Sequence, residues 1–351
     1  MTVMANQRYP LQVGSLRRVF ILTVAIAVAV AAAVIAQQTP SPAHVATTEH
    51  FVLHSDPWIN LHHFLYQWTR LDAGLSGGRK PVLVPERSAL GEMTGDARAD
   101  WQRALTFYRA AVAPKSHWDL EMLRLKRDLL NLSGDVTAPS PDGIKGVAQA
   151  LNIAMPIYRD KWWPHHDRAN REWIESVGSR LRRHEKGFVD LTTRLHGATW
   201  PMDRWRVDAS AYANGIAGYT TREGHVVVYS TDPGVQDLYA LEIVFHEIQH
   251  ATVIEGSTPD ALARAFKAAG VDVPANLSHA LIFATAGEFV RSIAAGEGRP
   301  RYEPYWLREG FETFDGWSHL VAPVNRHWLP IVRGETSRDE GLTALAASFR
   351  R

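Results

Sequence analysis

The sequence predicts an α+β protein that is predominantly helical, with a helical N-terminal region followed by a region that holds a small β-sheet. Apolar residues recur at helical spacing over much of residues 55–197, and the alternation typical of strands first appears near residue 206. Helical spacing returns after residue 237. Hydrophobic residues make up 46% of the 351 residues and charged residues 21%, which is typical of a chain that buries a core.

The composition excludes several classes of function. With 38 basic and 37 acidic side chains, the formal net charge is +1, which gives no indication of a nucleic-acid partner held by phosphate contacts. Cysteine is absent, so disulfides, cysteine-ligated metals and thiol catalysis are excluded. Any metal must therefore be held by His, Asp or Glu side chains, and the 16 histidines offer many candidates.

The N-terminus has the pattern of an export signal. Several arginines precede an uncharged apolar stretch at residues 19–36, which predicts a signal peptide over residues 1–36. A membrane anchor is the alternative, because about 20 apolar residues suffice to span a bilayer. In both cases we expect the rest of the chain to be exported to the periplasm or outside the cell, anchored in the inner membrane if residues 19–36 are retained. Residues 37–54 are predicted to form a linker.

Residues 55–199 are predicted to form the helical region. The first helix begins at Ser55-Asp56-Pro57, which combines a capping side chain with a proline in the first turn. Residues 133–146 are rich in Pro, Gly, Ser and Asp and are predicted to form a loop. The helices expected in this region cover residues 57–71, 96–112, 118–132 and 167–195.

Residues 200–351 are predicted to form the region with strands. Two β-branched segments flank Arg222-Glu223-Gly224, which is typical of a hairpin. The residues after 296 contain four prolines and are expected to be irregular. The expected strands cover residues 206–212, 218–221 and 225–230, and the expected helices cover residues 237–254, 259–269 and 276–295.

A metal site is predicted by the H-E-x-x-H motif from His246 to His250. The two imidazoles lie one turn apart and about 40° around the helix, so both can reach one metal ion. Glu247 lies between them and is placed to take a proton from a water that the metal activates. The alternative is a pair of ordinary surface histidines. The opposite face of this helix is apolar, at Leu241, Val244, Ile248 and Ala251.

The motif helix and the hairpin before it resemble the zincin metallopeptidases, in which an edge strand aligns an extended substrate above the zinc. No histidine lies between His250 and His279, so the longer metzincin motif is absent and the resemblance is to the gluzincin branch. Residues 60–66, 158–171 and 278–283 also resemble a family of exported bacterial proteins with this motif. The resemblance implies one zinc ion per chain and a zincin-like region over residues 200–351.

The third zinc ligand is open among three candidates. The gluzincin resemblance implies a glutamate on the next long helix, which is Glu288. His279 lies on the same helix, on a face that has the pattern of a core stripe. Glu255 would point away from the metal if the motif helix continued to it.

Other aromatic and histidine side chains have two interpretations each. Tyr302 and Tyr305 could stabilise an oxyanion, as a phenol does in gluzincins, or could pack in the core. His62 and His63 lie on an aromatic helix, which favours the core over ligation. The pair at residues 165–166 could line a cleft or cap the helix that follows, and the cap is favoured.

These patterns predict an exported zinc-dependent hydrolase, most simply a metallopeptidase acting on a peptide or protein substrate. One alternative is a zincin-derived binding or structural protein of the cell envelope without peptidase activity. Another is a metal-dependent hydrolase of a non-peptide bond, since the same water chemistry cleaves amides and esters. The presence of Glu247 favours a hydrolase, because a degenerate site usually loses its general base first.

Overall fold

The computed structural model describes residues 44–75, 84–130, 132, 144–197, 200, 203–213, 216–221, 224–255 and 258–350. Residues 42–351 belong to one compact unit. The chain is 66% helix with a five-stranded mixed sheet, so the predicted α+β class is confirmed. The predicted signal segment at residues 1–36 lies outside the described residues. Among the helices that are described, none is both long and apolar enough to cross a membrane.

The sheet joins segments that are far apart in the sequence. Its order is β1-β2-β3-β5-β4, with parallel pairing of β2 with β3 and of β3 with β5 and antiparallel pairing at both ends. In the described part of the chain, β4 is therefore an edge strand. The strands are β1 (His44–Thr47), β2 (Phe51–His54), β3 (Trp205–Ser210), β4 (Gly218–Thr221) and β5 (His225–Tyr229).

The assignment of residues 44–54 to a linker is wrong, because these residues form β1 and β2. Phe51 and Leu53 are fully buried while the residues that alternate with them are partly exposed. Phe51 pairs with Trp205 of β3, so the partner that stabilises this short strand lies about 150 residues away. Four residues with a distant partner carry too weak a local pattern to be recognised.

The helices before β3 are close to those predicted, with three differences. Residues 84–92 and residues 147–161 form two helices that were not predicted from the sequence. The long helix α7 begins at Trp163 and not near residue 167, so His165 and His166 lie in its first turn and do not precede it as a cap. The elements are α2 (Pro57–Asp72), α3 (Val84–Glu92), α4 (Gly95–Phe107) with a π-helical turn (Tyr108–Val112), α5 (Leu120–Leu129), α6 (Val147–Lys161) and α7 (Trp163–His196).

After the hairpin, α8 (Leu238–Glu255), α9 (Thr258–Ala269) and α10 (Leu277–Gly296) form as predicted. The segment expected to be irregular instead forms short helices, and its prolines lie mainly at their ends: Pro330 is in the first turn of α13 and Pro323 is the last residue of α12. The elements are α11 (Tyr305–Arg308), a 3₁₀ turn (Phe311–Thr313), α12 (Ser318–Pro323), a π-helical turn (Val324–Trp328), α13 (Leu329–Arg333) and α14 (Arg338–Ala347).

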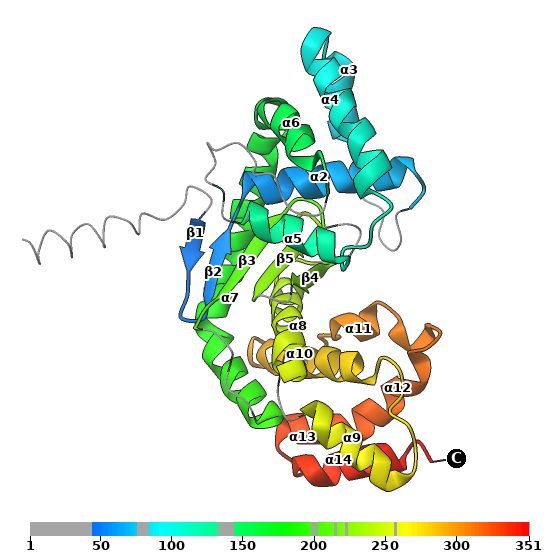
Figure 1. The fold of residues 1–351 in the computed structure, drawn as a ribbon. Coiled ribbons are helices and arrows are strands. Elements are labelled where there is room, and N and C mark those ends of the chain that lie inside the picture. Colours follow the sequence, from blue (N-terminus) through cyan, green and yellow to red (C-terminus); the bar gives the residue numbers. More distant parts are fainter. Residues whose placement is uncertain are drawn as a thin grey trace, which may run out of the picture. The chain divides into compact units, whose positions relative to one another are not determined.

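The sheet separates two hydrophobic cores. Val226 and Val228 of β5 point into the core shared with α7, α8 and α10, whereas Val227 and Tyr229 point into the core shared with α2, α4 and α6. Figure 1 shows α2, α5 and α6 gathered on one side of the sheet and α8, α10 and the C-terminal helices on the other. This layering places α8 beside β4 and β5 and beside α10.

Candidate metal centre

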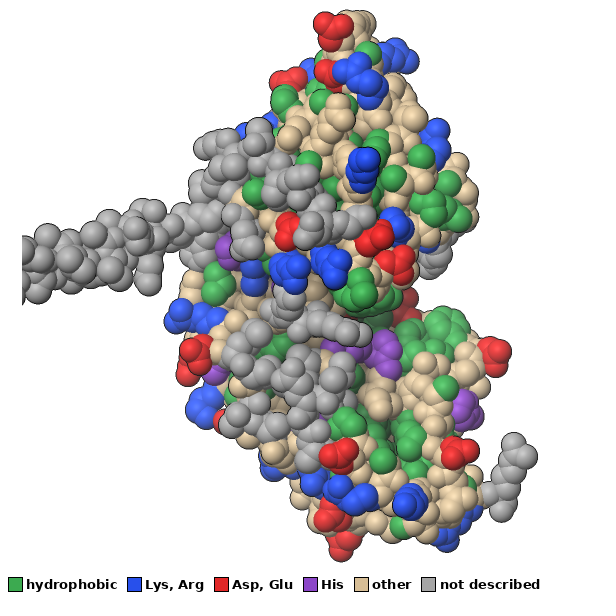
Figure 2. Space-filling model, in the orientation of Figure 1, with side chains coloured by type: hydrophobic (Ala, Val, Ile, Leu, Met, Phe, Trp, Pro, Cys, Tyr) green, Lys and Arg blue, Asp and Glu red, His purple; other side chains and the backbone are tan. Residues whose placement is uncertain are grey.

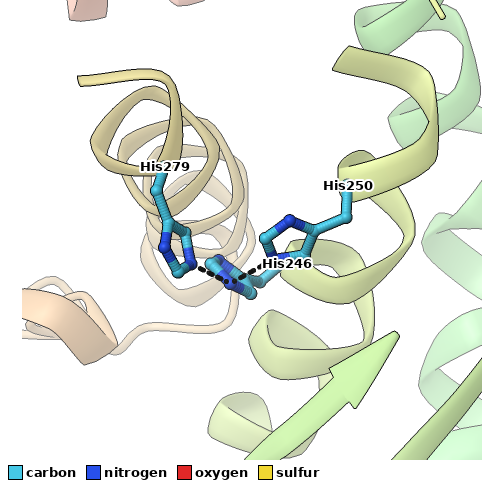
Figure 3. Close-up of side chains that lie close together, drawn as sticks. All are labelled: His246, His250 and His279. Atoms are coloured by element: carbon cyan, nitrogen blue, oxygen red, sulfur yellow. Dashed lines mark hydrogen bonds between the residues drawn. The ribbon is translucent and has the colours of Figure 1, made fainter. Parts of the chain in front are cut away.

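Three histidine side chains from two helices converge on one point. His246 and His250 extend from α8, and His279 extends from the first turn of α10. The Nε2 atom of His246 lies 3.3 Å from Nε2 of His250 and 3.1 Å from Nε2 of His279 (Figure 3). His246, His250 and His279 form a group that could hold a metal ion.

The spacing of these nitrogens fits a tetrahedral ion. Ligand nitrogens at 2.0–2.1 Å from a four-coordinate zinc lie about 3.3 Å from one another, close to the two separations observed. Burial lowers the pKa of His250 to about 4 and that of His279 to about 3. Burial, together with the two neighbouring histidines, holds the pKa of His246 well below its ordinary value. All three rings are therefore neutral at pH 7, which is the form that binds a metal.

Aromatic packing fixes the orientation of the imidazoles. The ring of Phe283, one turn after His279, lies 3.8 Å from the ring of His246 and 4.9 Å from the ring of His279, measured between centroids. Trp317 packs edge-on against His279 at 5.3 Å. On the opposite side of α8, Leu241, Val244 and Ile248 are fully buried, as the apolar pattern predicted. The helix thus has an apolar face opposite its histidines, and its residues from 241 to 249 are all buried.

The carboxylate of Glu247 lies against two of the three histidines. Its Oε1 atom is 3.9 Å from Nε2 of His246, and its Oε2 atom is 3.9 Å from Nε2 of His250. The hydroxyl of Thr220, on β4, donates to Oε2 at 2.9 Å and lies 2.6 Å from the backbone carbonyl oxygen of Glu247. Burial raises the pKa of Glu247 to about 8, against the opposing effect of the Thr220 hydrogen bond. The edge strand therefore fixes the carboxyl group of Glu247 beside the histidines.

Glycine at position 218 allows this close approach of strand and helix. A Cβ atom there would lie 3.0 Å from the carbonyl oxygen of Val227 and 3.5 Å from Cγ of Glu247. The first separation is tighter than an ordinary contact, as is the 3.0 Å to Cγ2 of Ile243 on α8, whereas the second is an ordinary van der Waals contact. Gly218 thus lets β4 pack closely against Ile243 of α8.

The centre is accessible from solvent. His246 and Glu247 are buried, but the side chain of His250 is 29% exposed and His279 is also partly exposed. Figure 2 shows histidine side chains reaching the surface beside a recess near the middle of this face, with hydrophobic side chains next to them. Two of the three histidine side chains are therefore partly exposed to solvent.

The expectation that Glu288 completes the site is corrected by the structure. Glu288 lies nine residues after His279 on α10, about 13.5 Å farther along the helix axis. Its carboxylate accepts hydrogen bonds from Arg291 and from Nε of Arg333, the latter at 2.6 Å. The structure instead brings His279, the alternative ligand, to the motif. The side chain of Glu255 lies outside the described residues.

Tyr302 and Tyr305 contact a buried carboxylate that the sequence analysis missed. The hydroxyl of Tyr302 donates to Oε2 of Glu242 at 2.5 Å, and the backbone N–H of Tyr305 donates to Oε1 at 2.8 Å. Glu242 lies one turn before His246 on α8 and is fully buried, which raises its pKa to about 7. Because the Tyr302 hydroxyl donates to Glu242, this contact fits the packing alternative and not the oxyanion role.

The remaining histidine candidates lie in the core. His62 and His63 are fully buried. Nδ1 of His63 bonds the carbonyl oxygen of Ile59 at 2.7 Å, and its Nε2 atom lies 2.5 Å from the hydroxyl of Tyr219. His166 is buried, with its Nδ1 atom 2.9 Å from the hydroxyl of Tyr158. None of these three belongs to the metal-binding group found among the described residues.

Thr220 is a further residue of the site that the sequence analysis missed. It occupies a predicted strand, but only the packing of β4 on α8 shows that its hydroxyl meets Glu247.

Comparisons with models of protein families, with curated proteins and with solved structures found no match to this chain. The convergence of His246, His250 and His279 beside Glu247 is accordingly the feature from which a function can be inferred.

Proposed function

We propose that this chain is a zinc-dependent hydrolase, most simply a metallopeptidase, with His246, His250 and His279 as the zinc ligands and Glu247 as the general base. The supporting observation is that the carboxylate of Glu247 lies 3.9 Å from two of the three converging nitrogens. Three neutral imidazoles leave one position of a tetrahedral ion open, which is the arrangement of catalytic zinc sites.

Zinc held by the three imidazoles would supply a Lewis acid that lowers the pKa of water toward about 7 and polarises the carbonyl under attack. Glu247, whose carboxylate lies 3.9 Å from two of the converging nitrogens, takes the proton from the attacking water. Thr220 holds Oε2 of this carboxylate, which keeps both of its oxygens beside the histidines. The same carboxylate can then deliver the proton to the leaving group.

The position of β4 favours a peptide substrate over other substrates. Among the described strands, β4 pairs only with β5, so its other side can accept an extended chain by backbone hydrogen bonds. Thr220 on this strand bonds Glu247, and a chain lying along the edge would therefore pass beside the general base. The proposal keeps the zincin motif but departs from the gluzincin pattern, because the third ligand is a histidine.

The experiment that tests this proposal measures zinc content and peptide cleavage on the same preparations. We expect one zinc per chain and cleavage of a peptide mixture that a chelator abolishes and zinc restores. Glu247→Gln should keep the zinc and lower the rate by about 10²–10⁴, the typical contribution of a general base. The exposed Glu312→Gln serves as the matched control and should change neither quantity.

The outcomes separate the alternatives. A Glu247→Gln variant that cleaves peptides at the wild-type rate would contradict the proposed base. A chain that binds zinc and cleaves no peptide but hydrolyses esters would support a hydrolase of another bond. A zinc-binding chain without any hydrolytic activity would support the zincin-derived binding protein.

Export is a separate part of the proposal and is supported by the basic and apolar residues of the first 36 positions. Residues 1–48 fused to a reporter that folds only outside the cytoplasm should give signal. A mature chain beginning at Gln37 would establish cleavage, and one that retains residues 19–36 would establish the anchor. Recovery of the native protein from the cytosol would contradict both.

A further inference from the structure

The side chain of Gln249 links the two helices that carry the histidines. Gln249 lies on α8 directly before His250 and is fully buried. Its Nε2 atom donates to the carbonyl oxygen of Phe245 on the same helix at 3.0 Å and to that of Ile282 on α10 at 3.2 Å. Ile282 lies three residues after His279. One amide group therefore connects α8 to the same turn of α10 that holds the third histidine.

Two more buried polar side chains lie near this amide. The side chain of His196, at the end of α7, interacts with that of Gln249. Nδ1 of His196 lies 2.8 Å from the hydroxyl of Thr258, the first residue of α9. Thr258 is fully buried, and His196 is 1% exposed. Hydrogen bonds thus join α8 to α10 through Gln249, and join α7 to α9 through His196 and Thr258.

Packing alone does not require a polar chain at this position. The neighbouring residues Ile248 and Leu281 are buried and apolar, and an apolar side chain of similar size would fill the space of Gln249 without burying polar atoms. A hydrogen-bonded amide differs from an apolar side chain in that it fixes the distance and the rotation of one helix relative to the other. A metal centre requires such precision, because ligand distances vary by only about 0.2 Å.

We propose that Gln249 is a positioning residue for the metal centre: its amide holds α10 so that His279 lies at bonding distance from an ion bound by His246 and His250. This inference rests on the proposed metal site and adds to it the residue that assembles it.

The test is a cobalt(II) titration of the full-length protein, followed by visible absorption. Gln249→Met keeps the length of the side chain and removes its hydrogen bonds. It should raise the cobalt dissociation constant by about 10–100-fold, the usual effect of losing a group that orients a ligand. It should also change the absorption spectrum of the bound cobalt, since the position of one ligand changes.

Thr285→Val is the matched control. Thr285 is fully buried on α10, the helix of His279; it donates to the carbonyl oxygen of Leu281 at 2.7 Å and accepts from Nε1 of Trp328 at 2.9 Å. This variant should lower the melting temperature, because it removes the hydrogen bonds of a buried hydroxyl. It should leave the cobalt affinity and the absorption spectrum unchanged. If Gln249→Met does not fold, Gln249→Leu provides the second variant: its side chain also cannot donate to the carbonyl oxygen of Ile282, so it should also weaken cobalt binding.

A double-mutant cycle with His279→Ala decides whether Gln249 acts through this histidine. Once His279 is absent, Gln249→Met should have no further effect on cobalt affinity. An equal effect in both backgrounds, or a Gln249→Met variant that binds cobalt as tightly as the wild type, would overturn the inference while leaving the metal site intact. A wild-type chain that binds neither cobalt nor zinc would overturn the metal site together with it.

Discussion

Replacing Glu247 with glutamine should stabilise the metal-free protein even though it removes the proposed base. Burial raises the pKa of this carboxyl from 4.5 to about 8. Folding therefore favours the protonated form, whereas the unfolded chain ionises it above pH 4.5. Because the folded state binds this proton more tightly, the free energy of unfolding is highest below pH 4.5 and falls as the pH rises toward 8.

The magnitude follows from the same values. At 1.36 kcal/mol for each pH unit above 4.5, the loss of stability reaches about 3 kcal/mol at pH 7. A glutamine amide has nearly the same shape, carries no charge and can still accept the hydrogen bond from Thr220. The variant should thus be more stable than the wild type by about 3 kcal/mol at pH 7 and by little at pH 4.5.

The assay is urea denaturation of both proteins in the presence of a chelator, at several pH values between 4.5 and 8. Glu312→Gln, on the surface, provides the control and should leave the free energy of unfolding within about 0.5 kcal/mol of the wild type. A destabilised Glu247→Gln variant, or a difference in stability that does not change with pH, would refute the reasoning.

Two further predictions concern the neighbours of the centre. Thr220→Val removes a hydrogen bond that lowers the pKa of Glu247, so the acidic limb of the pH–rate profile should move to higher pH; an unchanged or lower midpoint would contradict this role. Tyr302→Phe leaves Glu242 without one of its donors and should lower the free energy of unfolding by about 1–3 kcal/mol, measured by denaturation, with kcat unchanged. A large loss of kcat would instead restore the oxyanion role of Tyr302.

The parts of the molecule that were predicted correctly are those with local signals. The motif helix α8 combines histidines one turn apart with an apolar opposite face, and both features lie within one segment. The β4–β5 hairpin is short-range in the same way. The strands β1 and β2 lacked such a signal, because their stability depends on pairing with β3 far along the chain.

The third histidine shows why the site could be predicted only in part. His279 lies on the same face of α10 as Phe283, and this apolar stripe favoured a place in the core. These residues do pack in the core, but they pack against α8. In the first turn of α10, His279 therefore contacts His246 of α8. Which residue of one helix faces which residue of another depends on their crossing, and no local pattern encodes it. Glu288, favoured by the gluzincin resemblance, pairs with arginines instead.

The most direct test of the proposed centre compares zinc affinity in His279→Ala and Glu288→Ala. Loss of a residue that only orients a metal ligand typically raises the dissociation constant by about 10–100-fold. His279→Ala removes a ligand itself, so it should raise the zinc dissociation constant by more than that. Glu288→Ala should leave the affinity at the wild-type value, since its carboxylate bonds Arg291 and Arg333. A steep loss in Glu288→Ala with zinc binding retained in His279→Ala would contradict the three-histidine centre.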